Sequence, residues 1–563
     1  MSFACPVADQ RIVLDHVVRL PELARSNRFA EATQDVVNAV LEGAAEFAQG
    51  ELAPLNESGD REGSRWSDGA VTTPAGFREA YAKFVEGGWM GLSAPVEWGG
   101  QGLPHSLSAA MMEDFNAANL SFALCPMLTL GAIEALEAHG SDELKRAYLA
   151  KMVSGEWTAT MNLTEPQAGS DVGALKSRAV AADEGGWRVS GTKIFITWGE
   201  HDFTDNIVHF VLARTPDAPV GTKGISLFLV PKVLSDGRRN DLHCVSIEHK
   251  LGIHGSPTCV MSYGEQGGAT GWLVGPELGG MRAMFTMMNN ARLNVGLQGV
   301  GIAERATQRA VAFALERKQG QSAGLPTAIA EHPDVRRMLV RMRALTMAAR
   351  ALAYYAFGQV DRGTLGDREA RLRADVLTPL VKAWCTDVGC EVASLGIQVH
   401  GGMGFIEETG AAQHLRDARI APIYEGTNGI QAADFVSRKI GLDDGLTLDG
   451  LFADVRAEAQ HDQLILLADA VEILVASVRE AEPVDRLAGS YALMTMTAVL
   501  TAGWLMERLA RAIDAGEAAG VNAGRRAAIE YFLSGVVPEA LGLGAGVELG
   551  AEVLYRVPAE ELA

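Results

Sequence analysis

The chain has 563 residues, which at roughly 100–200 residues per domain predicts three or four domains. Its formal net charge of −21 excludes broad binding of nucleic acid, because phosphate binding needs clustered lysine and arginine. Six cysteines without a C-x-x-C pair predict neither a zinc site nor a redox motif. Such sparse cysteines, and a start without the apolar core of a signal peptide, predict a cytoplasmic protein.

The first region, to about residue 155, has a helical pattern. Apolar residues recur at helical spacing in Ala30–Phe47. A loop rich in Gly and Pro is predicted at Ala94–Pro104, and further helices at Ser106–Asn119 and Leu128–His139. We therefore expect a helical domain at the start of the chain.

The pattern changes near Trp157, and β-branched and aromatic residues alternate with polar ones to about Val274. Strands are predicted at Trp187–Thr197, Ile207–Thr215 and Gly224–Lys232. Gly- and Asp-rich turns separate these short strands, which indicates a small antiparallel β domain.

Helical periodicity returns after about Met281. Long Ala-rich helices are predicted at Arg292–Lys318, Asp334–Gly358 and Arg368–Gly396, and several long helices joined by short loops indicate a bundle. The tail after Leu442 is also helical and contains no lysine. Its uncharged run Leu487–Met506 includes glycines, threonines and a serine, so we expect a buried helix there and no membrane span.

The predicted fold is mainly α with a central β domain. A Rossmann fold is not favoured, because the Gly-rich run Gly401–Phe405 follows a helix rather than a strand. The predicted segments are an N-terminal extension (1–38), an N-terminal helical domain (39–156), the β domain (157–275), a helix bundle (276–441) and a C-terminal helical extension (442–563).

Two segments of the β domain carry small polar and aromatic residues. Met161–Ala179 forms a loop with Gly169 at its centre, and such a loop either approaches a flat ring system closely or is a plain turn. Gly191–Asp202 places Phe195 and Trp198 on a strand, where aromatics either back a ring or fill the core. Spacing alone favours the plainer interpretation of each segment.

The third informative segment is Gln398–Ile440. Here Glu425 lies between an aromatic residue and a glycine in an otherwise uncharged loop. A carboxylate in an apolar setting has a raised pKa, which suits a general base near neutral pH. A lone Glu on a loop is nevertheless usually solvated, and spacing does not override that.

Together with Leu293–Ala306, these three segments match the signature regions of the acyl-CoA dehydrogenase family in the right order, and the resemblance covers nearly all of residues 30–440. It implies a helical domain, a β barrel-like domain and a four-helix bundle, with FAD between the last two. It further implies a homodimer or homotetramer and electron-transferring flavoprotein as a partner. The extra C-terminal helical domain is an addition to this plan.

The resemblance implies that Glu425 is the base that removes the α-proton of an acyl-CoA thioester, with its own backbone N–H as an oxyanion donor. The residues that the resemblance assigns to FAD are Leu163, Thr164, Ser170, Phe195, Thr197, Gln398, Gly401, Gly402 and Thr427, with Arg317 and Gln319 reaching the FAD of a neighbouring subunit. The residues that it assigns to substrate are Arg292, Ser170 and Gly426.

The sequence both departs from the family and narrows the choice of base. Gly429 stands where many relatives have a Gln that touches FAD, which leaves that contact in doubt. Some relatives place the base on the bundle helix, near Ala291 here. Between Glu277 and Glu304 the chain has no Asp or Glu, so Glu425 remains.

Within the family, Pro54–Ser64, Thr73–Pro104 and Thr197–Asp202 resemble the 3-methylthiopropanoyl-CoA (3-methylmercaptopropionyl-CoA) dehydrogenase subgroup of dimethylsulfoniopropionate breakdown. A fatty acyl-CoA dehydrogenase of β-oxidation is the alternative, since a thioether and a methylene are close in size. A DNA-associated flavoprotein of the alkylation response is disfavoured by the acidic, lysine-free tail. An oxidase would differ only in its access to oxygen.

Overall fold

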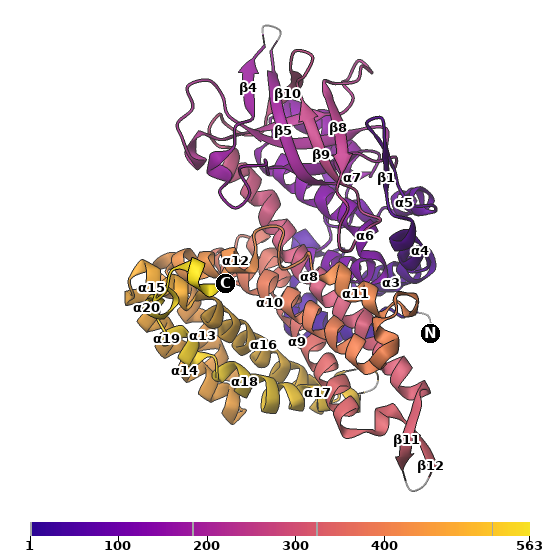
Figure 1. Cartoon of the computed structure of the whole chain (residues 1–563), viewed down its shortest axis with the longest axis vertical. Coiled ribbons are helices and arrows are strands. Elements are labelled where there is room, and N and C mark those ends of the chain that lie inside the picture. The colour runs from indigo at the N-terminus through magenta and orange to yellow at the C-terminus, as the bar shows by residue number, and fades with distance from the viewer. Residues whose placement is uncertain (1–2, 183–184, 323–324, 519, 521) are drawn as a thin grey trace. The chain divides into compact units, whose positions relative to one another are not determined.

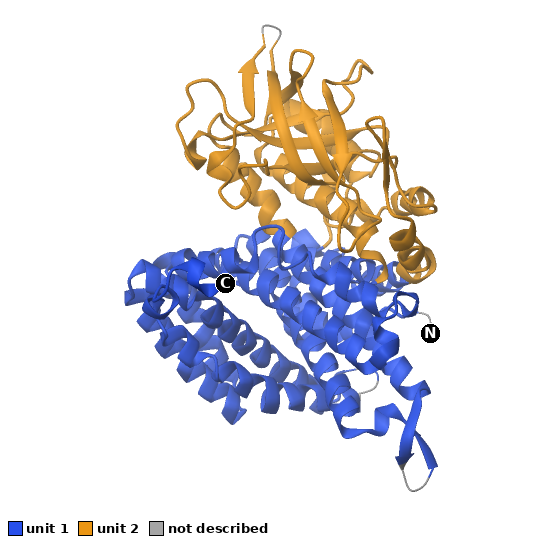
Figure 2. Cartoon of the chain, viewed as in Figure 1, with its two compact units in different colours: residues 1–45, 104–117, 292–563 blue, residues 46–103, 118–291 orange. Residues whose placement is uncertain are grey.

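The computed structural model describes residues 3–182, 185–322, 325–518, 520 and 522–563. Their contacts divide the chain into two compact units (Figure 2). The helical unit comprises residues 1–45, 104–117 and 292–563, and the sheet unit comprises residues 46–103 and 118–291. Helices predominate and the strands of the central sheet all lie in the sheet unit, which confirms the predicted fold class.

The described residues of the sheet unit form an eight-stranded sheet with the order β3-β6-β7-β10-β5-β9-β8, and β4 pairs with β5. β3 runs parallel to β6, and the other pairs are antiparallel. The strands are β3 Thr158–Asn162, β4 Arg178–Ala181, β5 Trp187–Thr197, β6 Ile207–Ala213, β7 Ser226–Pro231, β8 Leu242–Ile247, β9 Thr258–Tyr263 and β10 Ala269–Leu273.

Both faces of the sheet are covered where β6 and β7 lie, because these strands are buried along their whole length. On one face Val211, Phe228 and Val230 pack into a single apolar core with residues of β5, β8 and β9. The predicted bounds of β5 are confirmed. A helix is tied to the first strand of the sheet, since the Ala159 N–H donates to Thr129 Oγ1 at 3.0 Å.

Thr129 belongs to α6, His105–His139, which joins the two helices predicted at 106–119 and 128–139. Asn119 has φ −158° and ψ 93° inside it, so the helix is kinked there, and Asn119 Oδ1 caps the second part by accepting from the Phe122 N–H at 3.1 Å. Among the described helices only α6 is long and apolar enough to cross a membrane. Because 94% of its most apolar window is buried inside the protein, this is weak evidence for a span.

The other helices of the sheet unit are α4 Pro54–Glu62, α5 Phe77–Glu86 and α7 Asp142–Val153. A small hairpin of β1 (Arg65–Ser67) and β2 (Ala70–Thr72) follows α4.

Three long helices, α8 Gly280–Glu316, α9 Pro333–Thr364 and α10 Arg368–His400, confirm the predicted bundle of the helical unit. α8 and α10 approach closely at two glycines. A Cβ on Gly299 would lie 2.0 Å from the Cys385 carbonyl oxygen, and one on Gly389 would lie 2.8 Å from the Gly299 Cα. The backbones therefore pass in contact, which only glycine permits. Beyond α8, β11 (Lys318–Ser322) and β12 (Leu325–Ala328) form a hairpin that projects from the helices (Figure 1).

Helices from both ends of the chain complete this unit. The tail after residue 441 is helical as predicted, and its longest helix, α16, is buried through most of its length. The remaining principal helices are α1 Val7–Val13, α3 Gln34–Phe47, α11 Ala411–Ala418, α12 Asn428–Asp434, α13 Leu446–Glu458, α14 Asp462–Glu480, α16 Ser490–Asp514 and α17 Asn522–Tyr531.

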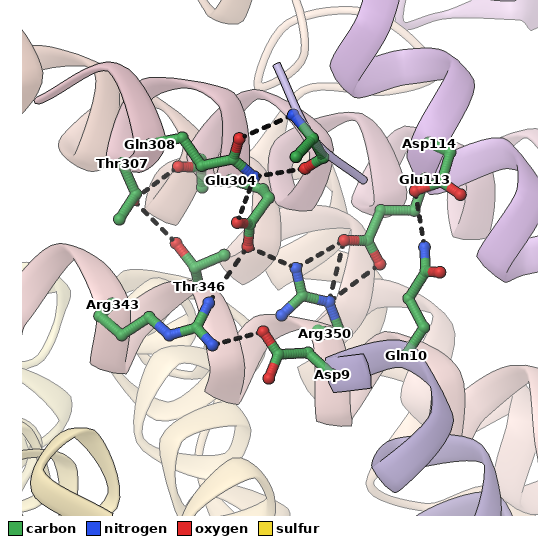
Figure 3. Close-up of polar contacts among 12 residues, drawn as sticks. Asp9, Gln10, Glu113, Asp114, Glu304, Thr307, Gln308, Arg343, Thr346 and Arg350 are labelled. Carbon is green, nitrogen blue, oxygen red and sulfur yellow. Dashed lines mark hydrogen bonds and ion pairs between the residues drawn. The ribbon is translucent and has the colours of Figure 1, made fainter. Parts of the chain in front are cut away.

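A buried cluster of charges joins these helices, and no sequence pattern predicted it (Figure 3). Arg350 of α9 is fully buried and donates to Glu113 at 2.6 Å and to Glu304 at 2.7 Å. Asp9 of α1 pairs with Arg343 and, at 2.7 Å, with Arg525. The cluster thus links α1, α6, α8, α9 and α17 through charges that compensate one another.

We predict that Arg350→Met lowers the free energy of unfolding by about 3–5 kcal/mol, because Glu113 would stay buried without a cation and Glu304 would keep only the contact of 3.5 Å with Arg343. Urea unfolding followed by far-UV circular dichroism measures the change. Arg526→Met is the matched control, since Arg526 and its partner Asp514 are both exposed and their ion pair contributes less than about 1 kcal/mol. Equal losses in the two variants would contradict a structural role for the cluster.

Candidate active site

The loop between α11 and α12 holds the predicted base and is fixed at both of its ends. Before Glu425, the Tyr424 N–H donates to the Ile420 carbonyl at 3.1 Å. After it, the Asn428 N–H reaches back to the Pro422 carbonyl at 2.9 Å. Thr427 caps α12, because its Oγ1 accepts from the Ile430 N–H at 3.2 Å. The loop is therefore a closed turn rather than an open segment.

Glu425 itself has a strained backbone, with φ 56° in the left-handed region that residues other than glycine rarely adopt. The next residue, Gly426, has φ 82°. Two side chains hold the Glu425 carbonyl in this position, since Arg292 Nε and Gln431 Nε2 each donate to it at 3.2 Å. A strained residue that its surroundings fix in this way is typical of a functional site.

The Glu425 carboxylate is half-buried, and no described residue donates a hydrogen bond to it. Burial raises its pKa, while the positive charges of Arg292 and Lys382 oppose the increase. The raised pKa predicted from the sequence is thus confirmed in direction. The uncharged setting is confirmed only for the loop, because two cations face the loop from α8 and α10. A carboxylate with a raised pKa and unoccupied lone pairs is equipped to accept a proton.

Lys382 is the site residue that sequence reasoning missed. It is fully buried on α10, and its Nζ donates to Asn428 Oδ1 at 2.9 Å. Burial lowers its pKa to about 7, and the charges of Glu425 and Asp387 limit the decrease. A single lysine within the apolar run of residues 376–386 was a signal that could have identified it, since lysine is rarely buried without a partner.

Five predicted residues form a second group in the helical unit, which we call the distal group: Arg317, Gln319, Gln398, Gly401 and Gly402. Phe313 stacks on His400 with ring centroids 4.3 Å apart, and this contact brings the ends of α8 and α10 together. Both Arg317 and Gln398 are exposed. Arg317 lies about 37 Å from Arg292 along α8 at 1.5 Å per residue, so the distal group and Glu425 do not share one site within a subunit.

The other five predicted residues, Leu163, Thr164, Ser170, Phe195 and Thr197, lie in the sheet unit. The loop after β3 runs beside β5, because the Ile194 N–H donates to the Thr164 carbonyl at 3.0 Å. Ser170 is exposed, whereas Leu163 and Thr164 are half-buried. The structure therefore brings the first two segments identified in the sequence side by side.

Phe195 of β5 and Trp198, which directly follows β5, have separate roles. A bulge between Lys193 and Ile196 gives Phe195 a left-handed φ of 59° and leaves its side chain 58% exposed. Trp198 is buried and packs 4.6 Å from Phe203 between ring centroids. Of the two interpretations left open for this segment, core filling holds for Trp198 alone, and Phe195 presents its ring outward.

A buried ion pair that the sequence did not predict holds the loop after β3. Lys193 Nζ lies 2.8 Å from Glu165 Oε1 and also donates to the Leu163 carbonyl at 3.0 Å. Glu165 further accepts from the Lys176 N–H at 2.7 Å and from Ser177. Lys193 and these hydrogen bonds lower the pKa of Glu165 to about 2 in spite of burial, so it is charged at neutral pH.

Protein-family models match four successive parts of the chain. They are described as the acyl-CoA dehydrogenase N-terminal domain (residues 35–156), middle domain (160–265) and C-terminal domain (279–440), followed by acetyl-CoA dehydrogenase C-terminal like (447–558). The last match covers most of the predicted C-terminal extension.

Relatives match over nearly the full length. The chain is 47% identical to 3-methylmercaptopropionyl-CoA dehydrogenase of Ruegeria pomeroyi, with 93% of each chain covered. It is 30% identical to the broad-specificity linear acyl-CoA dehydrogenase FadE5 of Mycobacterium tuberculosis, covering 94% of this chain and 95% of that one. An FAD complex of acyl-CoA dehydrogenase from Bacillus anthracis shares the fold, with a TM-score of 0.74, 22% identity, and coverage of 92% of this chain and 89% of that one. The chain therefore belongs to the acyl-CoA dehydrogenase family, whose members use FAD to oxidise a carbon–carbon bond of an acyl-CoA.

Proposed function

We propose that this acyl-CoA dehydrogenase converts 3-methylthiopropanoyl-CoA to 3-methylthioacryloyl-CoA in dimethylsulfoniopropionate breakdown, with Glu425 as the base. The observation that carries the base assignment is the strained Glu425, whose carboxylate accepts no hydrogen bond from any described residue. The substrate assignment is supported by the 47% identity to the R. pomeroyi enzyme, which extends through the C-terminal extension.

FAD fits the side chains of the sheet unit. Phe195 offers an exposed aromatic face on the bulge, beside the loop that Lys193 and Glu165 fix, and such a face suits a flat ring. We assign the flavin side to Leu163, Thr164, Ser170, Phe195 and Thr197, with Thr427 in the helical unit as a further contact. When bound, FAD supplies the acceptor for the hydride that leaves Cβ of the substrate.

The remaining chemistry belongs to the base loop. The α-proton of the thioester passes from Cα to a carboxylate oxygen of Glu425, and Arg292 and Lys382 favour the charged form of Glu425 beforehand. Negative charge then develops on the thioester oxygen, which needs a donor. No described residue accepts a hydrogen bond from the Glu425 N–H, so this amide is available for that role. Gly426, without a side chain, leaves the approach to the amide open.

We also propose a homodimer or homotetramer. The residues of the distal group are exposed, and Arg317 lies about 37 Å from Arg292 along α8, so Arg317 is far from the base loop of its own chain. We assign Arg317 and Gln319 to the FAD of a neighbouring subunit, and Gln398, Gly401 and Gly402 to its adenosine half. A Cβ on Gly401 or Gly402 would meet nothing within 4 Å, which leaves room for a ligand. We further propose that electron-transferring flavoprotein accepts the electrons from this enzyme. We also propose that the enzyme is located in the cytoplasm.

A linear fatty acyl-CoA is the second candidate substrate. The 30% identity to the broad-specificity enzyme of M. tuberculosis extends over the same length of chain and favours this candidate. A thioether and a methylene differ little in size and polarity, so the two candidates differ chiefly in the chain length that the pocket admits.

We predict that Glu425→Gln retains FAD but reduces its flavin at least about 10²-fold more slowly with acyl-CoA, because general-base catalysis contributes 10²–10⁴-fold. Anaerobic stopped-flow bleaching of the flavin absorbance measures the rate. Glu548→Gln, at an exposed glutamate of the C-terminal extension, is the matched control and retains the wild-type rate. Undiminished bleaching in Glu425→Gln would remove Glu425 from this role.

A panel of acyl-CoA substrates tests the proposed specificity. We expect the highest kcat/KM with 3-methylthiopropanoyl-CoA, butanoyl-CoA within about 10–200-fold of it, and palmitoyl-CoA lowest. A dye acceptor with the purified FAD-loaded protein gives the three values. A preference for palmitoyl-CoA would support the second candidate instead.

A further inference from the structure

A chain of hydrogen bonds runs from the C-terminal extension to the loop of Glu425. Tyr491 of α16 donates through its hydroxyl to Asp387 of α10. The other carboxylate oxygen of Asp387 accepts from Asn428 Nδ2 at 2.9 Å, and Asn428 Oδ1 accepts from Lys382 Nζ at 2.9 Å. All four residues lie in the helical unit. The chain thus connects a helix beyond residue 441 to the lysine that faces the base.

Asn428 is the point at which this chain holds the loop. It is 4% exposed, and its Nδ2 also donates to the Ala383 carbonyl at 3.1 Å and lies 3.0 Å from Thr386 Oγ1. Its own N–H donates to the Pro422 carbonyl on the far side of Glu425. Because both its side chain and its backbone are bound, a shift of Asn428 would move the loop that carries the base.

Lys382 and Asp387 are the two residues with ionisable groups that face each other in this series of hydrogen bonds. A buried amine needs a counter-charge, and Lys382 finds it in Asp387 and Glu425. Burial raises the pKa of Asp387, and the hydrogen bonds from Tyr491 and Asn428 limit the increase. Two other charged groups face these residues: Arg292 on α8 faces Lys382, and Arg419 at the end of α11 faces Asp387. Arg292 in turn faces Asp434 and Arg438.

We propose that the C-terminal extension positions the catalytic base: Tyr491 fixes Asp387, Asp387 and Lys382 fix Asn428, and Asn428 fixes the loop of Glu425. This inference rests on the proposed role of Glu425 and deepens it. Tyr491, Asp387, Asn428 and Lys382 are positioning residues, and Lys382 also supplies a positive charge beside the base. The extension therefore contributes to the reaction itself as well as to the stability of the bundle.

Tyr491→Phe tests the first link because it removes one hydroxyl from a residue that is 42% exposed, where folding is not at risk. We expect the limiting rate of flavin reduction to fall about tenfold, since a small displacement of a reacting group is costly, with KM for acyl-CoA, FAD content and Tm unchanged. Tyr555→Phe removes the hydroxyl of a tyrosine that is 74% exposed in the same extension and is the control. A wild-type rate in Tyr491→Phe would overturn the proposal.

Lys382→Met tests the charge by its pH dependence. Loss of the cation raises the pKa of Glu425, so the acid limb of the rate profile moves to higher pH. In the wild type the positive charge of Lys382 is present below its pKa of about 7 and lost above it. The variant is therefore slowest relative to wild type below pH 7, and the ratio narrows above it, whereas Lys382→Arg, which stays charged at every pH, keeps the acid limb of the wild-type profile. A loss of equal size at every pH would contradict the assigned charge role.

The double variant Tyr491→Phe with Lys382→Met decides whether the links act as one chain. If they do, the combined loss of rate is smaller than the product of the two single losses, because the second change removes what the first has already released. If the combined loss of rate equals the product of the two single losses, the two residues act independently, and the proposed series of hydrogen bonds is contradicted. Every variant is compared on one acyl-CoA that the wild type oxidises, so a wrong substrate leaves the test intact. A wrong base is detected separately by Glu425→Gln.

Discussion

The site depends on one carboxylate that is kept close to positive charge without being neutralised by it. Glu425 is half-buried, which favours its neutral form, while Arg292 and Lys382 favour its charged form. Neither cation donates a hydrogen bond to the carboxylate, since Arg292 binds the Glu425 backbone carbonyl and Lys382 binds Asn428. The group therefore stays free to take up a proton while its pKa is still adjusted by charge. A direct ion pair would have lowered its pKa and occupied the lone pairs that the reaction needs.

Holding a glutamate in the left-handed region costs energy, of order 1–3 kcal/mol for such a residue, and the rest of the helical unit offsets that cost. α8 contributes Arg292, α10 contributes Lys382 and Asp387, and α12 contributes Gln431 and its capping threonine. Close packing of α8 against α10 at glycines brings these side chains within reach of one loop. The buried charges around Arg350 join helices from both ends of the chain in the same unit.

In the sheet unit, as in the helical unit, buried charged side chains fix a loop, but here the loop lies beside an exposed aromatic residue. Lys193 and Glu165 form a buried ion pair that fixes a loop, and the bulge beside it directs Phe195 outward instead of into the core. In each unit a buried lysine hydrogen-bonds to the backbone or to an amide next to the candidate site. A buried lysine makes such bonds because an ammonium donor left without a partner is costly once water is removed. Ion pairs and hydrogen bonds are directional, so they specify the position of these loops more narrowly than apolar packing alone would.

Much of this protein is determined by the local pattern of its sequence. Alternation defined β5 to the residue, helical periodicity found α9 and α10, and the composition of residues 487–506 indicated a buried helix rather than a span. The signature segments taken together indicated the family, and that resemblance predicts Glu425 as the base. Periodicity could not show that residues 106–139 form one kinked helix, because Asn119 bends it without a proline or glycine to mark the place.

Only the tertiary structure decided which polar residues meet. Lys382 and Glu425 are 43 residues apart and Asp387 and Tyr491 are 104 apart, so no spacing rule links them. The sequence likewise could not separate Phe195 from Trp198. Trp198 directly follows β5, and the bulge that turns Phe195 outward arises from the pairing of β5 with β9. Charge compensation and strand register depend on contacts between distant segments, and these contacts exist only once the chain has folded.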